Sequence, residues 1–143
     1  GGAPNIIAGH GEIIVDGRML PNQSTENYIN QVKELLGEGY EIEIIKSIEG
    51  CERDPNTPLF DTIEKAIIKN DPEAVVTPYL MTGFDDSLFY GKLGIIMYGF
   101  QPIQVPNDFN LMAQYHAVNE RIPLKGFHWG VKTFWSFIED FCV

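Results

Sequence analysis

The sequence has few cysteines and no long hydrophobic run. Its two cysteines, Cys51 and Cys142, lie far apart without C-x-x-C spacing, so the pattern indicates neither a zinc knuckle nor a disulfide scaffold. We expect free thiols in a reducing, cytoplasmic compartment. The longest apolar stretches are only a handful of residues, as in LGIIMYGF at 93–100, which is too short to cross a membrane. No charged-then-apolar leader opens the sequence, so neither a membrane anchor nor secretion is predicted.

Basic residues are also scarce. Ten lysines and arginines face twenty aspartates and glutamates, which gives a formal charge of -10. Such a surface repels phosphate backbones, so we expect no nucleic acid partner. A sugar, peptide or amino-acid ligand is easier to accommodate. The 143 residues, 44% of them hydrophobic, are enough for one domain or two small domains with a buried core.

The first part of the sequence alternates strand and helix patterns. A β-branched run at 12–20 is followed by a helical pattern that Ser24 caps and Gly37 ends. The next run, YEIEII at 40–45, alternates acidic and apolar residues as a strand does. The predicted order of this part is therefore β-α-β.

A loop rich in turn formers, GCERDPNTP at 50–58, separates this part from the rest. We therefore divide the sequence into domains 1–50 and 51–143. The second part predicts helices at 58–69, at 86–93 and from 124 onward, with strands at 74–80 and 94–100. Such alternation favours a mixed α/β layer with some parallel pairing, because each crossover helix covers a face of the sheet.

The closing helix carries large apolar side chains at the three-and-four spacing of one buried face. We predict that this stripe forms core, and that Trp129 and Phe137, which lie off it, sit at an interface. The stripe consists of Leu124, Phe127, Val131, Phe134, Trp135, Ile138 and Phe141.

The three histidines do not by themselves predict a metal site. His10 lies in a glycine-flanked turn and His128 lies off the apolar stripe, so both are expected on the surface. His116 alone also favours a structural role, because a metal needs several donors converging at about 2 Å.

Four short motifs in a fixed order change that interpretation. They are APNIIAGHGEIIVDGRMLP, MTGFDDSLFYGKLGI, YGFQP and HAVNERIP. In this order and spacing they resemble the C-terminal part of the M20 family of metal-dependent amidohydrolases and metallopeptidases, which includes aminoacylase, succinyl-diaminopimelate desuccinylase and carboxypeptidase G-type enzymes. The resemblance covers essentially the whole sequence.

The resemblance implies a site with two zinc-like ions in the complete enzyme. Family members supply most ligands through a His-x-Asp pair, a bridging Asp, a Glu-Glu pair and a further acidic residue, all before the point that corresponds to the start of this sequence. The last motif adds a histidine, matched here by His116. No His-x-Asp or Glu-Glu pair occurs in the sequence, so we expect no catalytic residue in this chain and no activity from it alone.

The other matched residues are on the substrate side. The resemblance implies that Asn5 and Arg18 grip a carboxylate or carbonyl oxygen, which suits a planar guanidinium, and that Gly83 and Asp86 line the substrate cleft. Without the resemblance, Asn5 is a turn former, Arg18 ends a strand, and Gly83 and Asp86 belong to a turn.

The sequence also departs from the family pattern. Asp85 stands where the family often has threonine, Leu88 where it often has arginine, and Ala8 where proline is usual. Leu88 removes one expected contact to substrate.

The implied fold is the second half of a ferredoxin-like dimerisation domain followed by the C-terminal part of an α/β catalytic domain. The implied function is a portion of a hydrolase that cleaves an amide or peptide bond next to a carboxylate, acting on an N-acyl amino acid or a peptide, as a homodimer. The alternative is a catalytically silent oligomerisation module derived from that family.

Overall fold

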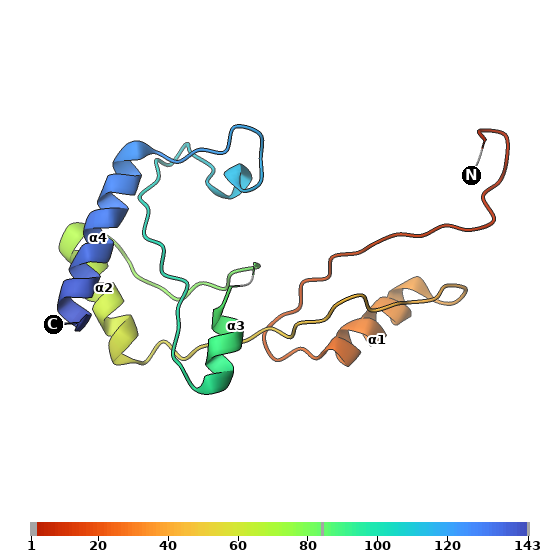
Figure 1. Ribbon diagram of the computed structural model, residues 1–143, viewed down its shortest axis with the longest axis horizontal. Helices are drawn as coiled ribbons and strands as arrows, with labels where there is room; N and C mark the ends of the chain where they lie inside the picture. Colours follow the sequence, from red (N-terminus) through yellow and green to blue (C-terminus); the bar gives the residue numbers. More distant parts are fainter. Residues whose placement is uncertain (1–2, 84, 143) are drawn as a thin grey trace. The chain divides into compact units, whose positions relative to one another are not determined.

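The computed structural model describes residues 3–83 and 85–142, so Phe84 of the second motif lies outside the described residues. The chain divides into two units, Gly1–Glu52 and Arg53–Val143, which are described separately (Figure 1). Unit 1 contains α1 (Thr25–Leu36). Unit 2 contains α2 (Pro58–Asn70), α3 (Ser87–Tyr90), α4 (Leu124–Cys142) and the two 3₁₀ turns η1 (Gly91–Leu93) and η2 (Met112–Gln114).

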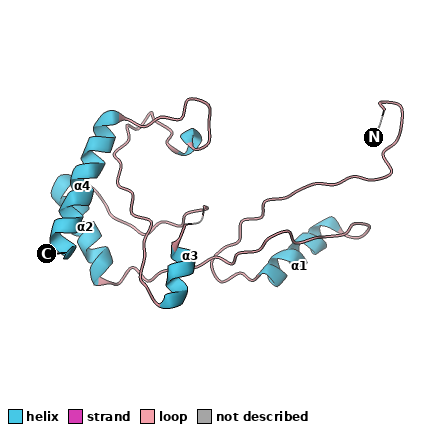
Figure 2. Ribbon diagram, viewed as in Figure 1, coloured by secondary structure: helices cyan, strands magenta, loops and turns pink. Residues whose placement is uncertain are grey.

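The mixed α/β prediction is wrong. Helices are the only regular elements in residues 3–83 and 85–142 (Figure 2), so neither the sheet nor the ferredoxin-like half-domain is present there. Segments with strand patterns remain irregular and exposed; Ile13 and Ile14 are 83% and 79% accessible. Alternating apolar residues favour a pleated, half-buried segment, but a strand also needs a partner for its backbone groups. Most backbone hydrogen bonds outside the helices join close sequence neighbours.

The predicted ends of α1 are confirmed. The Ser24 side chain accepts a hydrogen bond from the Asn27 amide at 3.2 Å, and Gly37, with φ 80°, donates its amide to the Lys33 carbonyl. A left-handed φ is easy for glycine and costly for most other residues. Local chemistry therefore defines the helix, although none of its residues is buried.

The predicted helix at 58–69 is confirmed as α2. Thr57 caps it by accepting from the Phe60 amide at 3.2 Å, and Pro58 occupies the first turn, where its missing N–H costs nothing. Ile63 and Ala66 are the buried residues of this helix. The helix packs against α4.

The closing helix forms as predicted, but the prediction of its buried face is wrong. Side chains of the apolar stripe are exposed: Phe127, Val131 and Trp135 are 46%, 53% and 62% accessible. The buried residues of α4 are instead small: Gly126, Gly130, Thr133 and Ser136.

Backbone packing explains this reversal. A Cβ atom at Gly126 or Gly130 would overlap the main-chain carbonyls of Gln104 and Pro102 respectively. The segment that contains them therefore lies directly on the helix backbone, and the Gln104 amide reaches the Gly126 carbonyl at 3.5 Å. Large side chains exclude such an approach, so the helix turns its small residues inward.

Polar contacts also join α2 and α4. The Trp129 indole donates to the Asn70 carbonyl at 3.1 Å, and the Asn70 side-chain amide donates to Ser136 Oγ at 3.3 Å. Phe137 packs against Phe100, with ring centroids 5.7 Å apart. The two aromatic residues predicted at an interface thus contact other parts of unit 2.

Candidate functional site

His116 lies in a loop that follows η2. The Ala117 amide donates to the Gln114 carbonyl at 3.1 Å, which closes a turn around His116. His116 has φ 59° and Asn119 has φ 62°. Few residues with a side chain adopt this left-handed conformation, and asparagine, aspartate and histidine are enriched among those that do. Both side chains are exposed. The loop therefore leaves the imidazole of His116 exposed at the surface of unit 2.

The described residues do not make up a metal site by themselves. No group of three or more His, Cys, Asp or Glu side chains converges anywhere in residues 3–83 and 85–142. A structural or catalytic zinc takes at least three protein ligands, and His116 offers one. His10 and His128 are exposed, as predicted. We therefore derive no reaction step through a metal in this chain.

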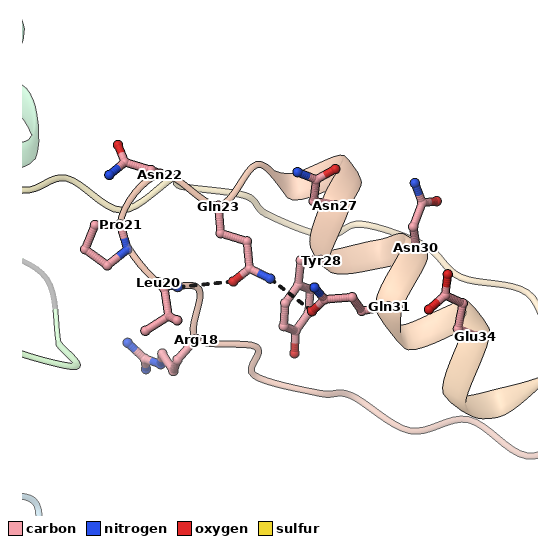
Figure 3. A pocket seen from close by; sticks show the side chains of 10 residues that line it. All are labelled: Arg18, Leu20, Pro21, Asn22, Gln23, Asn27, Tyr28, Asn30, Gln31 and Glu34. Carbon is pink, nitrogen blue, oxygen red and sulfur yellow. Dashed lines mark hydrogen bonds between the residues drawn. The ribbon is translucent and has the colours of Figure 1, made fainter.

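Arg18 lies in unit 1 beside an open hollow (Figure 3). Its guanidinium is paired with Asp16, with Nη2 and Nε at 2.6 and 3.2 Å from Oδ2. The two side chains are 55% and 72% exposed, so the pair is largely hydrated and weak. A ligand carboxylate at this position would compete with Asp16 for the guanidinium.

The hollow itself is polar. Gln23 accepts from the Leu20 amide at 3.2 Å and donates to Gln31 Oε1 at 3.1 Å, and Figure 3 shows this chain of bonds crossing from the loop to α1. The Tyr28 ring lies against Gly17, where a Cβ would meet its hydroxyl at 2.5 Å. The other lining residues are Pro21, Asn22, Asn27, Asn30 and Glu34.

Asn5 belongs to a local turn in which the Ile6 amide donates to the Ala3 carbonyl at 3.1 Å. Its side chain is exposed, and it is not among the residues that line the hollow beside Arg18. The structure of unit 1 therefore does not bring Asn5 and Arg18 together in one pocket.

Gly83 and Asp86 lie in the turn before α3, and both are exposed. The Asp86 carbonyl accepts from the amides of Phe89 and Tyr90 at 3.0 and 3.1 Å, but its carboxylate makes no capping bond to the helix. Asp85 does this instead, because its Oδ1 accepts from the Ser87 amide at 2.9 Å. The Asp86 carboxylate is thus not used to cap the helix.

The structure adds residues that sequence patterns missed. Arg53, in what looked like a linker, donates from Nη2 to the Ser87 carbonyl at 2.9 Å. Its guanidinium also occupies the space that a Cβ of Gly91 would fill. The spacing of four between Gly126 and Gly130 was a signal for close backbone packing on α4, whereas nothing near Arg53 in sequence indicated its contact with α3.

Comparison with known proteins gives one weak similarity. No protein-family model matches the chain, and no solved structure matches it. The chain is 22% identical over 144 residues to a Dictyostelium discoideum protein named Probable carboxypeptidase S-like 2, covering 98% of this chain and 27% of that protein. The chain thus spans about a quarter of the length of that relative. The similarity points to a peptidase-related family at most and does not identify the M20 family.

None of the helices formed by the described residues combines the length and apolar character that crossing a membrane demands.

Proposed function

We propose that the chain is the C-terminal portion of an M20-type, metal-dependent hydrolase that cleaves an amide or peptide bond next to a carboxylate. The observation that carries this proposal is the similarity to a carboxypeptidase S-like protein along 98% of the chain. The order of the four motifs within the same residues is consistent with this proposal. The proposed substrate is an N-acyl amino acid or a peptide.

His116 contributes one neutral imidazole to a zinc site whose other ligands come from the rest of the complete protein. Its exposed position on the loop after η2 is compatible with this role. No cluster of metal-ligating side chains forms among the described residues, and the other donors are proposed to come from the rest of the complete protein. The chain alone is therefore proposed to be inactive.

Arg18 and Asn5 act on the substrate. The guanidinium of Arg18 binds the substrate carboxylate, which displaces the exposed and weak ion pair with Asp16. Asn5 offers an amide to a carbonyl oxygen from a different part of unit 1. Asp86 and Gly83 are proposed to line the substrate cleft of the complete enzyme.

A second candidate is a catalytically silent oligomerisation module that forms a homodimer. It is favoured by apolar side chains that the described part of unit 1 leaves exposed, such as Ile13, Ile14 and Val15 at 83%, 79% and 70%. Apolar segments with strand propensity and no partner tend to pair with another copy.

Three observations test these candidates. The complete reading frame should encode upstream His-x-Asp and Glu-Glu motifs, and the complete protein should hydrolyse N-acyl amino acids with zinc while the 143-residue chain does not. Turnover by the isolated chain would contradict its proposed inactivity, and no turnover by the complete protein would contradict the hydrolase proposal. Light scattering tests the second candidate: a monomer at all concentrations would contradict it.

A further inference from the structure

Arg53 joins the segment before α2 to the start of α3. Its Nη2 donates to the Ser87 carbonyl at 2.9 Å, and the side chain is half-buried. A hydrogen bond from a charged donor in a partly desolvated position is among the stronger ones in proteins. This contact therefore restrains Ser87, although 34 residues separate the two in sequence.

Gly91 makes the contact possible. The Arg53 guanidinium lies where a Cβ of residue 91 would be. Gly91 has φ -61° and ψ -30°, an ordinary helical conformation that alanine adopts more readily than glycine. Glycine is thus needed at this position for the close approach of Arg53 and not for its backbone angles.

The segment that carries Arg53 is itself anchored. The Tyr98 hydroxyl donates to the Asp54 carbonyl at 2.6 Å, and the Thr57 hydroxyl lies 2.6 Å from the same Tyr98 oxygen. Thr57 in turn caps α2. The backbone next to Arg53 is therefore hydrogen-bonded to Tyr98 and, through Thr57, to the start of α2.

Ser87 is held through both of its backbone groups. Its amide donates to Asp85 Oδ1 at 2.9 Å, while its carbonyl accepts from Arg53. Asp86 lies between these two anchors, with an exposed carboxylate that makes no capping bond. We infer that Arg53 is a positioning residue that holds Asp86 in place for substrate binding, an inference that rests on the proposed role of Asp86 in the substrate cleft.

The first experiment measures the turn without substrate. In the labelled 143-residue chain, the amides of Phe89 and Tyr90, which donate to the Asp86 carbonyl, report its order through hydrogen exchange. Arg53→Met should accelerate their exchange roughly tenfold. Gly91→Ala should do the same, although alanine favours the helix. Lys92→Ala, an exposed neighbour, should change nothing. Unchanged exchange in both test variants would overturn the inference.

The second experiment uses the complete protein with an N-acyl amino acid. Arg53→Met should raise KM roughly tenfold and leave kcat unchanged, and Arg53→Lys should recover part of the loss because a donor remains. Asp86→Ala is the reference. If it raises KM and Arg53→Met does not, the positioning role is wrong. If Asp86→Ala leaves KM unchanged, the substrate role of Asp86 fails and the inference fails with it, even where exchange responds.

Discussion

The two units carry similar helical patterns but bury them to different extents. In unit 2, α2 and α4 pack together and bury small and apolar residues of both helices. In unit 1, α1 has no buried residue, and its Leu35 is 85% exposed. A helix face is thus buried only where a second surface comes close, and α4 buries the face that carries its small residues, where glycines admit another backbone.

The contacts that hold unit 1 are correspondingly polar and exposed. Thr25 bonds to Ser47 through their hydroxyls, its amide donates to Glu49 at 3.3 Å, and Tyr40 donates to the Lys33 carbonyl at 3.3 Å. Exposed hydrogen bonds of this kind typically contribute about 0.5–1.5 kcal/mol each, whereas burying a large apolar side chain contributes about 1.5–3 kcal/mol. We therefore expect α1 to open before the α2 and α4 pair.

The largest expected effect follows from the proposed role of His116, in unit 2, as a zinc ligand. His116→Ala in the complete protein should lower zinc content and reduce kcat by on the order of 100-fold or more, since even groups that only support a metal ligand are worth roughly 10–100-fold. Metal analysis and steady-state kinetics measure both. His128→Ala, another exposed histidine of unit 2, is the control. Full zinc content with normal turnover would show that His116 is not a ligand.

The next largest effect is expected for substrate binding, when Arg18 of unit 1 is replaced. Arg18→Ala in the complete protein should raise KM by the equivalent of roughly 1.5–3 kcal/mol, the value of a hydrogen bond to a charged group, with little change in kcat. Asp16→Asn weakens the competing ion pair and should lower KM or leave it unchanged. If kcat of the Arg18→Ala variant fell by as large a factor as KM rises, Arg18 would have a role beyond substrate binding.

Packing in unit 2 can be broken at one glycine. Gly130→Ala places a Cβ against the Pro102 carbonyl, so the free energy of unfolding of unit 2 should fall by about 1–3 kcal/mol, despite the better helix propensity of alanine. Urea denaturation followed by circular dichroism measures this. Gly11→Ala, where a Cβ meets nothing within 4 Å, is the matched control. A stabilised Gly130 variant would refute the backbone contact.

The smallest expected effect concerns the cap of α1. Ser24→Ala should lower the stability of this helix by about 1 kcal/mol, because the Asn27 amide loses its acceptor. Amide exchange should accelerate throughout α1 and stay unchanged in α2 and α4. Faster exchange in α2 or α4 as well would contradict a purely local effect of the cap.

Local signals in the sequence predicted helices well. Ser24, Gly37 and Thr57 are found at the helix ends where capping chemistry places them, since a cap depends only on residues a few positions away. The buried face of α4 was not predictable from its apolar stripe, because burial depends on what approaches the helix. Gly126 and Gly130 were visible in the sequence, but the backbone that fills their groove comes from a distant segment.

The prediction of a sheet was wrong for a related reason. Residues 12–20 and 40–45 have the composition of strands, but strand formation requires pairing that no single segment specifies. The candidate site shows the same limit: resemblance named His116, Asn5, Arg18, Gly83 and Asp86, and these remain predictions. The contact of Arg53 could not be predicted, because its partner, Ser87, is far away in the sequence.

The left-handed turn at His116 has a consequence for protein engineering. Glycine would relieve the cost of φ 59°, which is about 1–2 kcal/mol for most residues that carry a side chain. The same substitution deletes the imidazole. Selection for thermal stability alone would therefore favour glycine at this position, whereas selection for metal-dependent turnover would favour histidine if His116 has its proposed role as a zinc ligand. A library sorted by both criteria should separate the two demands at this single residue.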